Sequence, residues 1–294
     1  MKRFVGVILT AALVLGISAC GNSETRPESI GEKPQSASST AVSDTTGLSK
    51  ENPVTLKLAI TGEKSDVWEN VKERLIDEGV DLELVFFSDY IIPNTALADG
   101  DVDLNAFQTE IFFSNYVEES GAELTSLIPT VLAPMGIYAG QIDDIAQLKE
   151  NDKISVPNDP TNGGRALILL QAAGIIKVNP DAGLTPAVRD ITENPLNIQI
   201  VELAAPQIPT TLDEVALGVV NSGIAVTAGF APLEDSIFIE DENTEGIENY
   251  YNIIAVQTAR KDDPAILKVI EIYQTDETKE VIKESSNGAN IPIF

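Results

Sequence analysis

Arg165 is the residue whose type and setting most clearly suggest recognition of a small molecule. It lies in the segment NDPTNGGRALILLQAAG, residues 158–174, about one turn into an expected helix. Gly163 and Gly164 remove side chains from the first turn, which would leave its N–H groups open to an anion. The planar guanidinium offers the paired donors that suit a carboxylate. The alternative is a structural ion pair with one of the 46 acidic residues.

The composition of the chain excludes several other kinds of chemistry. It contains no histidine, and its only cysteine is Cys20. His-based triads, cysteine nucleophiles in the folded part and His/Cys zinc sites are therefore excluded. The arginine segment lacks the GxxxxGK and GxGxxG patterns of phosphate-binding loops. A net charge of −27 repels nucleic acid. We expect no metal, no cofactor and no nucleic-acid partner.

The residues around Arg165 carry the signals of a helix start and a helix stop. Asp159 can cap the helix with Pro160 in its first position, and Gly174 suits a left-handed stop. The helix is therefore expected from about residue 160 to 173. Its apolar side chains would face a core: Leu167, Leu169, Leu170 and Ala173.

The elements that position this helix follow an α/β pattern. Residues 54–60 and 80–87 are typical of strands, and residues 65–79 between them have helical spacing, with Ser65 as cap and Gly79 as stop. Further strand-like segments are residues 136–139, 153–156, 198–203, 217–220 and 252–256. About 240 residues of alternating elements exceed what one doubly wound sheet usually needs, so an α/β fold with two lobes is expected.

The N-terminus has the pattern of an export signal. Lys2 and Arg3 precede an apolar run at residues 4–17, which is shorter than the roughly 20 residues of a membrane-spanning helix. The run ends in Ile-Ser-Ala-Cys, which resembles the lipobox of bacterial lipoproteins. We expect residues 1–19 to be a signal peptide and Cys20 to carry two acyl chains, which give durable anchoring. The alternative is a plain signal peptide followed by a stray cysteine.

A polar segment separates the cysteine from the expected folded part. Residues 21–52 are rich in Ser, Thr, Gly, Glu and Pro, and have almost nothing to bury. We expect residues 20–52 to form the lipidated cysteine and a flexible tether with a reach on the order of 30 Å. Such a tether would let an anchored domain move between solvent and a membrane partner.

Four long stretches resemble a known family. They are FFSDYIIPNTALADGDVDLNAFQ, NDPTNGGRALILLQAAGII, ITENPLNIQIVELAAPQIP and the C-terminal YYNIIAVQTARKDDPAILKVIEIYQTDETKEVIKE. Together they resemble the methionine-binding lipoproteins of ABC importers, the NlpA/MetQ type, from about residue 56 to the end. The resemblance implies a two-lobed type II periplasmic-binding-protein fold with the ligand cleft between the lobes. Lobe I would contain residues 53–137 and 252–294, and lobe II residues 138–251.

The resemblance also implies a set of ligand-binding residues. Arg165 matches an arginine that grips the ligand carboxylate, and Asn162 an asparagine of the same loop. Asn221 and Asn252 match two asparagines that hold the amino and carboxyl groups. Three rings match positions that line the side-chain pocket: Tyr90, Phe107 and Phe112. Without the resemblance, the rings would be interpreted as packing residues and the asparagines as turn residues at strand ends.

Three positions depart from the family pattern. Thr109 lies where the family commonly has histidine, Ile224 where tyrosine is common, and Phe112 where tyrosine is more frequent. All three changes are expected at the side-chain end of the ligand, and Thr109 is therefore included among the expected ligand-binding residues. A wider and less polar tail pocket, with loose discrimination among ligands, would follow.

The expected function is that of a lipid-anchored substrate-binding protein, and not that of an enzyme. It would capture an amino acid, with methionine expected, and hand it to an ABC permease with its ATPase. The protein would be a monomer outside the cytoplasm, attached to the bacterial cell membrane. Another apolar amino acid or a short methionine-containing peptide is the alternative ligand. An enzyme using Asp/Glu pairs, or an adhesin or signalling protein without transport, would be a different class.

Overall fold

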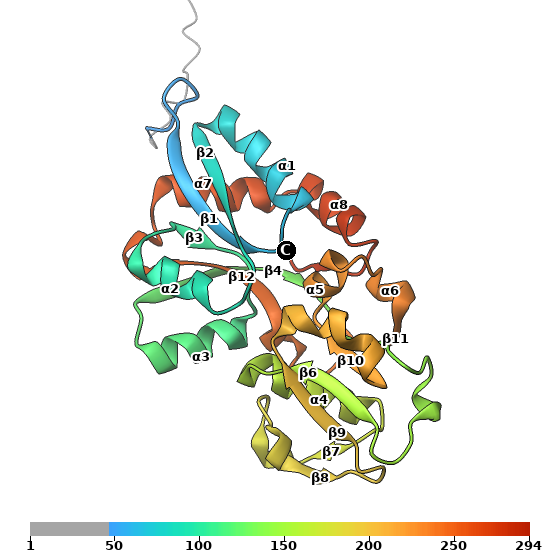
Figure 1. Ribbon diagram of the computed structural model, residues 1–294. Helices are drawn as coiled ribbons and strands as arrows, with labels where there is room; N and C mark the ends of the chain where they lie inside the picture. The colour runs from blue at the N-terminus through green and yellow to red at the C-terminus, as the bar shows by residue number, and fades with distance from the viewer. Residues whose placement is uncertain (1–46) are drawn as a thin grey trace, which may run out of the picture. The chain divides into compact units, whose positions relative to one another are not determined.

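The computed structural model describes residues 47–294, which contain two main sheets (Figure 1). The first sheet has six strands in the order β13-β4-β12-β3-β1-β2, and with its helices we call it lobe I. The second has five strands in the order β11-β5-β10-β6-β9, and we call it lobe II. The chain passes from lobe I to lobe II between β4 and β5, and returns between β11 and β12.

Lobe I is built from both ends of the described chain. Its strands are β1 Val54–Thr61, β2 Val80–Phe87, β3 Leu104–Asn105, β4 Leu124–Leu132, β12 Tyr251–Gln257 and β13 Ile291–Pro292. Its helices are α1 Asp66–Leu75, α2 Ile92–Asp99, α3 Glu110–Ser120, α7 Pro264–Tyr273 and α8 Asp276–Ser285. β1 runs parallel to β2 and β3, whereas β12 runs antiparallel to β3 and β4.

The expected β-α-β start of lobe I is confirmed. Ser65 caps α1, because its Oγ accepts a hydrogen bond from the Trp68 N–H at 3.3 Å. A 3₁₀ turn at Ile76–Glu78 extends the helix, and Gly79 stops it in the left-handed conformation at φ 81°. β2 then begins at Val80 and pairs with β1 along its whole length.

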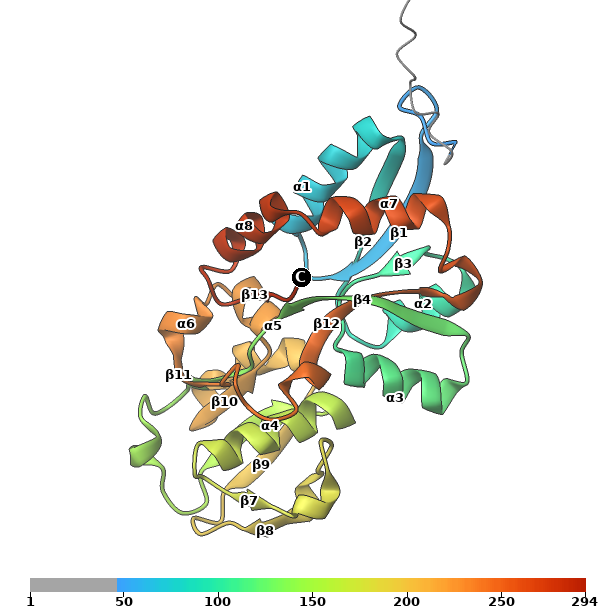
Figure 2. The same ribbon diagram turned by 180° about the vertical axis from the view of Figure 1, so that it is seen from behind.

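Helices cover both faces of the lobe I sheet (Figure 2). α1, α7 and α8 bury Trp68, Val269 and Ile282 against one face. α2 and α3 bury Leu97 and Phe113 against the other. Because both faces are covered, the sheet of lobe I is an inner layer of the lobe.

Lobe II contains the helix that carries Arg165. Its sheet consists of β5 Gly136–Ala139, β6 Lys153–Pro157, β9 Gln199–Leu203, β10 Leu217–Val220 and β11 Ser236–Ile239, with a separate pair β7 Lys177–Val178 and β8 Ile191–Glu193. Its helices are α4 Pro160–Ala172, α5 Ser222–Thr227 and α6 Pro232–Asp235. Since β5 begins at Gly136 and pairs only within this sheet, the sheets change before residue 136, two residues earlier than the expected boundary.

The apolar face predicted for α4 is confirmed. Leu167, Leu169 and Leu170 are buried in the main core of lobe II, and Ala173 packs against the same cluster while partly exposed. A second, smaller cluster on this lobe contains Tyr138, Ile208, Leu212, Val220 and Ala225. The helix is therefore fixed to the sheet, and its first turn keeps a defined position.

The end of the expected tether is part of lobe I. Leu48 packs against the main lobe I core, and Lys50 forms an ion pair with Asp77. The prediction of a flexible tether as far as residue 52 is therefore wrong for residues 48–52, because Leu48 supplies an apolar anchor point. The expected signal peptide, Cys20 and the rest of the tether lie outside the described residues.

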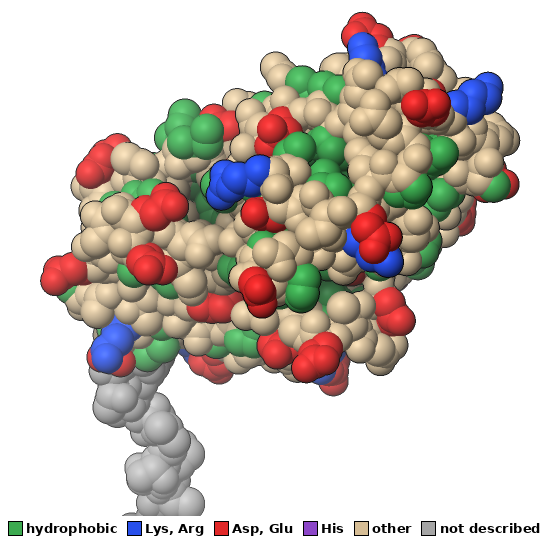
Figure 3. All heavy atoms as spheres, turned by 90° about the horizontal axis from the view of Figure 1, so that it is seen from below, with side chains coloured by type: hydrophobic (Ala, Val, Ile, Leu, Met, Phe, Trp, Pro, Cys, Tyr) green, Lys and Arg blue, Asp and Glu red, His purple; other side chains and the backbone are tan. Residues whose placement is uncertain are grey.

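The described surface is predominantly acidic, as the net charge of −27 requires. On the face shown in Figure 3, acidic side chains are scattered among fewer basic ones. None of the helices within residues 47–294 is long and apolar enough to cross a membrane. This part of the chain therefore offers a dispersed negative charge and not a basic surface for nucleic acid.

Candidate functional site

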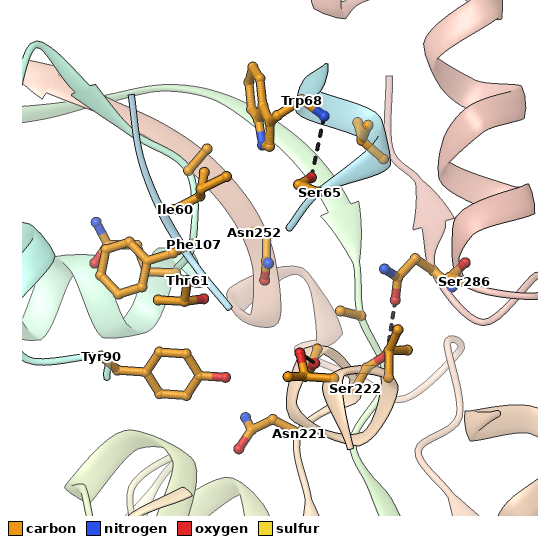
Figure 4. A pocket seen from close by; sticks show the side chains of 18 of the residues that line it. Ile60, Thr61, Ser65, Trp68, Tyr90, Phe107, Asn221, Ser222, Asn252 and Ser286 are labelled. Atoms are coloured by element: carbon orange, nitrogen blue, oxygen red, sulfur yellow. Dashed lines mark hydrogen bonds between the residues drawn. The ribbon is translucent and has the colours of Figure 1, made fainter. Parts of the chain in front are cut away.

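A cavity of about 510 Å³ is lined by residues from both lobes. Its size lies within the range of small-molecule sites. All eight residues predicted to bind ligand line it: Tyr90, Phe107, Thr109, Phe112, Asn162, Arg165, Asn221 and Asn252. Figure 4 shows Tyr90 and Phe107 on one side of the cavity, Asn252 above it, and Asn221 reaching in from the start of α5. The structure thus gathers the predicted set, whose role in binding stays a prediction.

One end of the cavity is aromatic. The ring centroids of Phe107 and Phe112 are 6.1 Å apart, and that of Tyr90 lies 6.2 Å and 6.5 Å from them. The rings of Phe107 and Phe112 are nearly perpendicular, at 77°. Such a group of rings contributes apolar surface and polarisable faces, which suit an aliphatic or thioether chain.

Tyr90 adds a hydrogen-bond donor to this apolar end. Burial raises the pKa of its phenol well above the ordinary value, and the nearby Asp159 carboxylate raises it further, whereas Arg165 acts in the opposite direction. The hydroxyl therefore stays protonated at neutral pH. It can donate to an acceptor on a ligand without carrying charge.

Thr109 has a structural task in addition to its place in the cavity. Its Oγ1 caps α3 by accepting a hydrogen bond from the Phe112 N–H at 3.4 Å, and its backbone pairs with that of Asn252. The hydroxyl is thus directed at the helix. The expectation that threonine at this position makes the tail pocket wider and less polar stays a prediction. Ile224 packs against the cluster around Tyr138 and is not among the cavity-lining residues. Whether isoleucine in place of the family's tyrosine widens the tail pocket stays a prediction.

A buried amide network supports the aromatic end. The Asn94 Nδ2 donates to Gln108 Oε1 at 2.6 Å, and the Gln108 Nε2 donates back to Asn94 Oδ1 at 2.7 Å. Asn105 joins by donating to Asn94 Oδ1 at 2.9 Å. These three side chains are almost fully buried, so the network supports the segment between β3 and α3, which carries Phe107 and Thr109. Sequence reasoning missed it, because the partners are 3 to 14 residues apart and show no periodic pattern.

The guanidinium of Arg165 is already paired with a carboxylate of the protein. Its Nε donates to Glu240 Oε1 at 2.9 Å, and its Nη2 donates to Glu240 Oε2 at 2.5 Å and to the Ala133 carbonyl at 3.1 Å. The ring of Tyr250 lies 4.5 Å from the Cζ of Arg165. Burial raises the pKa of Tyr250 to about 12. Glu240 and the Ala133 carbonyl thus engage Nε and Nη2, whereas Nη1 makes no hydrogen bond within residues 47–294. The expected contact of Arg165 with a ligand carboxylate stays a prediction.

Glu240 was missed at the level of sequence. It lies 75 residues from Arg165, at the end of β11, among many other acidic residues. Both side chains are nearly inaccessible, at 3% exposed for Arg165 and 9% for Glu240. Arg165 therefore forms a structural ion pair, which was the alternative interpretation of this residue, and it also lines the cavity.

The first turn of α4 is closed to an external anion. Asp159 caps it, with Oδ1 accepting from the Asn162 N–H at 2.8 Å. A Cβ at Gly164 would lie 2.6 Å from Thr185 Cα, and one at Gly163 would lie 2.8 Å from the Pro157 carbonyl oxygen. The glycines therefore allow close packing of backbone. The prediction that they open the helix terminus to a ligand is wrong, because a carboxylate of the chain occupies that position.

The polar end of the cavity contains side chains with unused hydrogen-bonding capacity. Asn221 donates from Nδ2 to Asn162 Oδ1 at 2.7 Å, but its own Oδ1 is buried and accepts no hydrogen bond within residues 47–294. The Asn252 side-chain amide makes no hydrogen bond in the same part of the chain. A buried acceptor without a donor costs about 1–3 kcal/mol, so a ligand that donates to it recovers that energy.

No group of acidic, histidine or cysteine side chains within residues 47–294 could hold a metal ion. The predicted residues that line the cavity instead combine a guanidinium, three amides and three rings. This arrangement can orient a small molecule with a polar end and an apolar end.

The sheets and the cavity between them define a two-lobed substrate-binding protein, and comparison with known proteins agrees. The model of the NlpA lipoprotein family matches residues 56–294, and this chain belongs to that family. The D-methionine-binding lipoprotein MetQ of Salmonella typhimurium is 39% identical over 250 residues, which are 83% of this chain and 90% of that protein.

Solved structures show the same fold. The substrate-binding protein of a methionine transporter from Streptococcus pneumoniae is 36% identical with a TM-score of 0.77, covering 82% of this chain and 96% of that one. A nutrient-binding protein from Burkholderia cenocepacia, solved bound to methionine, is also 36% identical with a TM-score of 0.77, covering 81% and 100%. The family and these relatives are binding proteins and not enzymes.

Proposed function

We propose that this protein captures methionine and delivers it to an ABC importer. The names of its relatives support this ligand, since they include D-methionine-binding lipoproteins and the binding protein of a methionine transporter. The cavity supports it independently, because an aromatic end and a polar end lie within one space of about 510 Å³.

The observation that carries the proposal is the unpartnered acceptor of Asn221. Its buried Oδ1 accepts from no donor among the described residues, and an α-ammonium group is a strong donor for it. The ligand carboxylate would then meet the Asn252 amide and the Nη1 of Arg165. The thioether chain would lie among the rings of Tyr90, Phe107 and Phe112, where sulfur makes favourable contacts.

The Arg165–Glu240 pair favours a ligand without net charge. The guanidinium and its carboxylate neutralise each other, so the cavity wall does not attract an anion as a lone arginine would. An amino acid with an uncharged side chain has one ammonium group, which would meet Asn221 Oδ1, and one carboxylate, which would meet Arg165 Nη1. A dicarboxylic amino acid would bring an unmatched negative charge.

Calorimetry on ligand-free protein tests the proposal. The protein is unfolded, dialysed and refolded, and then titrated with L-methionine, D-methionine, norleucine, leucine and aspartate. We expect both methionine and norleucine to bind, and aspartate to bind at least a hundredfold more weakly. Mass spectrometry of the compound released on denaturation gives a second measurement. Tight binding of aspartate, or binding of none of the five, would contradict the proposal.

A short methionine-containing peptide is the second candidate ligand. The cavity extends beyond the predicted residues to Trp68, Ser286 and Asn290, which leaves room for another residue. Gly-Met and Met-Gly belong in the same titration. Binding of either peptide more tightly than methionine would favour this candidate.

We further propose that a lipid on Cys20 anchors a monomeric protein outside the cytoplasm. The lipobox-like sequence supports the anchor, as does membership in a family of lipoproteins. Cys20→Ser should then move the protein from the detergent phase to the aqueous phase without changing ligand affinity. Unaltered partitioning would refute the anchor, and light scattering tests the monomer.

A further inference from the structure

Asp159, Asn162 and Asn221 form a directed chain of hydrogen bonds that ends in the cavity. We propose that Asp159 is a positioning residue that sets the direction of this chain and makes Asn221 an acceptor for the ligand's ammonium group. The inference rests on the proposed function. Asp159 is not a cavity-lining residue, so its hydrogen bonds would reach the ligand only through the two asparagines.

The first link of the chain has only one direction when the Asp159 carboxyl is ionised. Burial raises the pKa of this carboxyl, and the hydrogen bonds from Asn162, which favour the ionised form, act in the opposite direction. An ionised carboxylate accepts hydrogen bonds and donates none. The Asn162 Nδ2 lies 3.1 Å from Asp159 Oδ1 and 3.0 Å from Oδ2. Turning the Asn162 amide over would place its oxygen against both carboxylate oxygens. Asp159 therefore determines which end of the Asn162 amide faces Asn221.

The second link passes that direction to the cavity. Because Asn162 turns its Oδ1 toward Asn221, the Asn221 Nδ2 must donate to it, and does so at 2.7 Å. No other side-chain hydrogen bond fixes the Asn221 amide among residues 47–294. Its Oδ1 is left as the buried acceptor on the opposite side. Without Asp159, nothing in the described chain would prefer this orientation to the reverse.

Direction matters because the two orientations select different ligands. An acceptor at Asn221 favours a positively charged donor such as an α-ammonium group. The reversed amide would present N–H groups, which repel an ammonium group but can donate to a hydroxyl oxygen. The chain therefore predicts discrimination between an α-amino acid and the corresponding α-hydroxy acid, and it places the origin of that discrimination outside the cavity.

Asp159→Asn tests this direction with little other change. Asparagine caps helices as well as aspartate does, so its oxygen can keep the bond from the Asn162 N–H. Its NH₂ group would instead face the Asn162 Nδ2 and favour reversal of both amides. Asp144→Asn is the matched control, because Asp144 caps a 3₁₀ turn by accepting from the Ala146 N–H at 2.8 Å and contacts no amide chain.

The measurement is calorimetric titration with methionine and with 2-hydroxy-4-(methylthio)butanoate, its α-hydroxy analogue. In Asp159→Asn we expect methionine affinity to fall by about tenfold or more, because a charge-assisted bond is lost. The affinity for the hydroxy analogue should change less than threefold. Asp144→Asn should bind both compounds like the wild type.

Two outcomes overturn the inference. Equal losses for both compounds in folded Asp159→Asn would mean that Asp159 only maintains the shape of the site, and no loss for either would mean that it sets nothing. If wild-type protein bound neither compound, the proposed function would fail instead. In that case the side-chain amide NMR signals of Asn162 and Asn221 would still test the orientation of the two amides. If Asp159→Asn left the contacts of these amide groups unchanged, the proposed reversal of the amides would be refuted.

Discussion

Arg165 illustrates how one side chain can serve the fold and the site together. Its Nε and Nη2 hold Glu240, which ties the start of α4 to the end of β11. Arg165 also lines the cavity, and its Nη1, which makes no hydrogen bond within residues 47–294, is the donor proposed to contact a ligand. A buried guanidinium that is already paired needs no large rearrangement on binding. The cost is that a substitution at Arg165 changes stability and affinity together.

A double-mutant cycle separates these two roles. Arg165→Ala and Glu240→Ala should each lower the free energy of unfolding by about 3–5 kcal/mol, because each leaves an unpaired buried charge. The double variant should recover part of that loss. Ligand affinity should fall by tenfold or more in Arg165→Ala and in the double variant, and by much less in Glu240→Ala. Thermal unfolding and calorimetry provide the two readouts.

Wild-type affinity in Arg165→Ala, with lowered stability, would make the arginine a purely structural ion-pair partner. Additive stability losses in the double variant would instead show that the two side chains are not coupled.

For single residues, the sequence predicts which side chains line the cavity, but not which other side chains they hydrogen-bond. Arg165 was found from its setting in the sequence and Asn221 and Asn252 through the resemblance, and all three line one cavity. Glu240 and the positioning role proposed for Asp159 were not found. Local patterns show a helix cap at Asp159, but they do not show which distant donor a carboxylate meets after folding.

The elements of the fold follow local sequence signals closely. β2, β5 and β10 occupy the predicted residues, and α4 ends one residue before its predicted end. Alternating apolar residues and unambiguous caps explain this agreement. The docking of Leu48 on lobe I was not predicted, because a single leucine in a polar segment gives no periodic signal.

The glycines of α4 were identified as important for an incorrect reason. Gly164 lies where the helix meets the backbone of Leu184 and Thr185, so there is no room for a side chain. A sequence motif shows that glycine is present, but not whether the missing side chain makes room for a ligand or for the protein's own backbone.

Gly164→Ala distinguishes these possibilities. The added Cβ would lie 2.6 Å from Thr185 Cα, so we expect a loss of about 1–3 kcal/mol, measured by chemical denaturation. Gly223→Ala in α5 is the control, since nothing lies within 4 Å of its Cβ position. That variant should be as stable as the wild type or slightly more stable, because alanine favours helix. Equal stability of the two variants would contradict the packing role of Gly164.

The whole molecule brings the two lobes together around one cavity. The expected two-lobed α/β fold is confirmed, although the boundary between the sheets lies slightly earlier than predicted. Among the described residues, hydrogen bonds that join the lobes include those from Asn115 to Thr161 at 3.1 Å and from Ser222 to Asn290 at 3.0 Å.

A ligand held by both lobes should stabilise the molecule as one unit. Ligand at 100 times its dissociation constant adds about 2.7 kcal/mol, which for a domain of this size raises the melting temperature by about 5–10 °C. We expect methionine to produce this shift in a single unfolding transition, measured by calorimetric scanning. Lobe I supplies the aromatic rings and lobe II supplies Arg165 and Asn221, so neither lobe can unfold without releasing the ligand. Two transitions, of which methionine shifts only one, would show that the ligand is held by a single lobe.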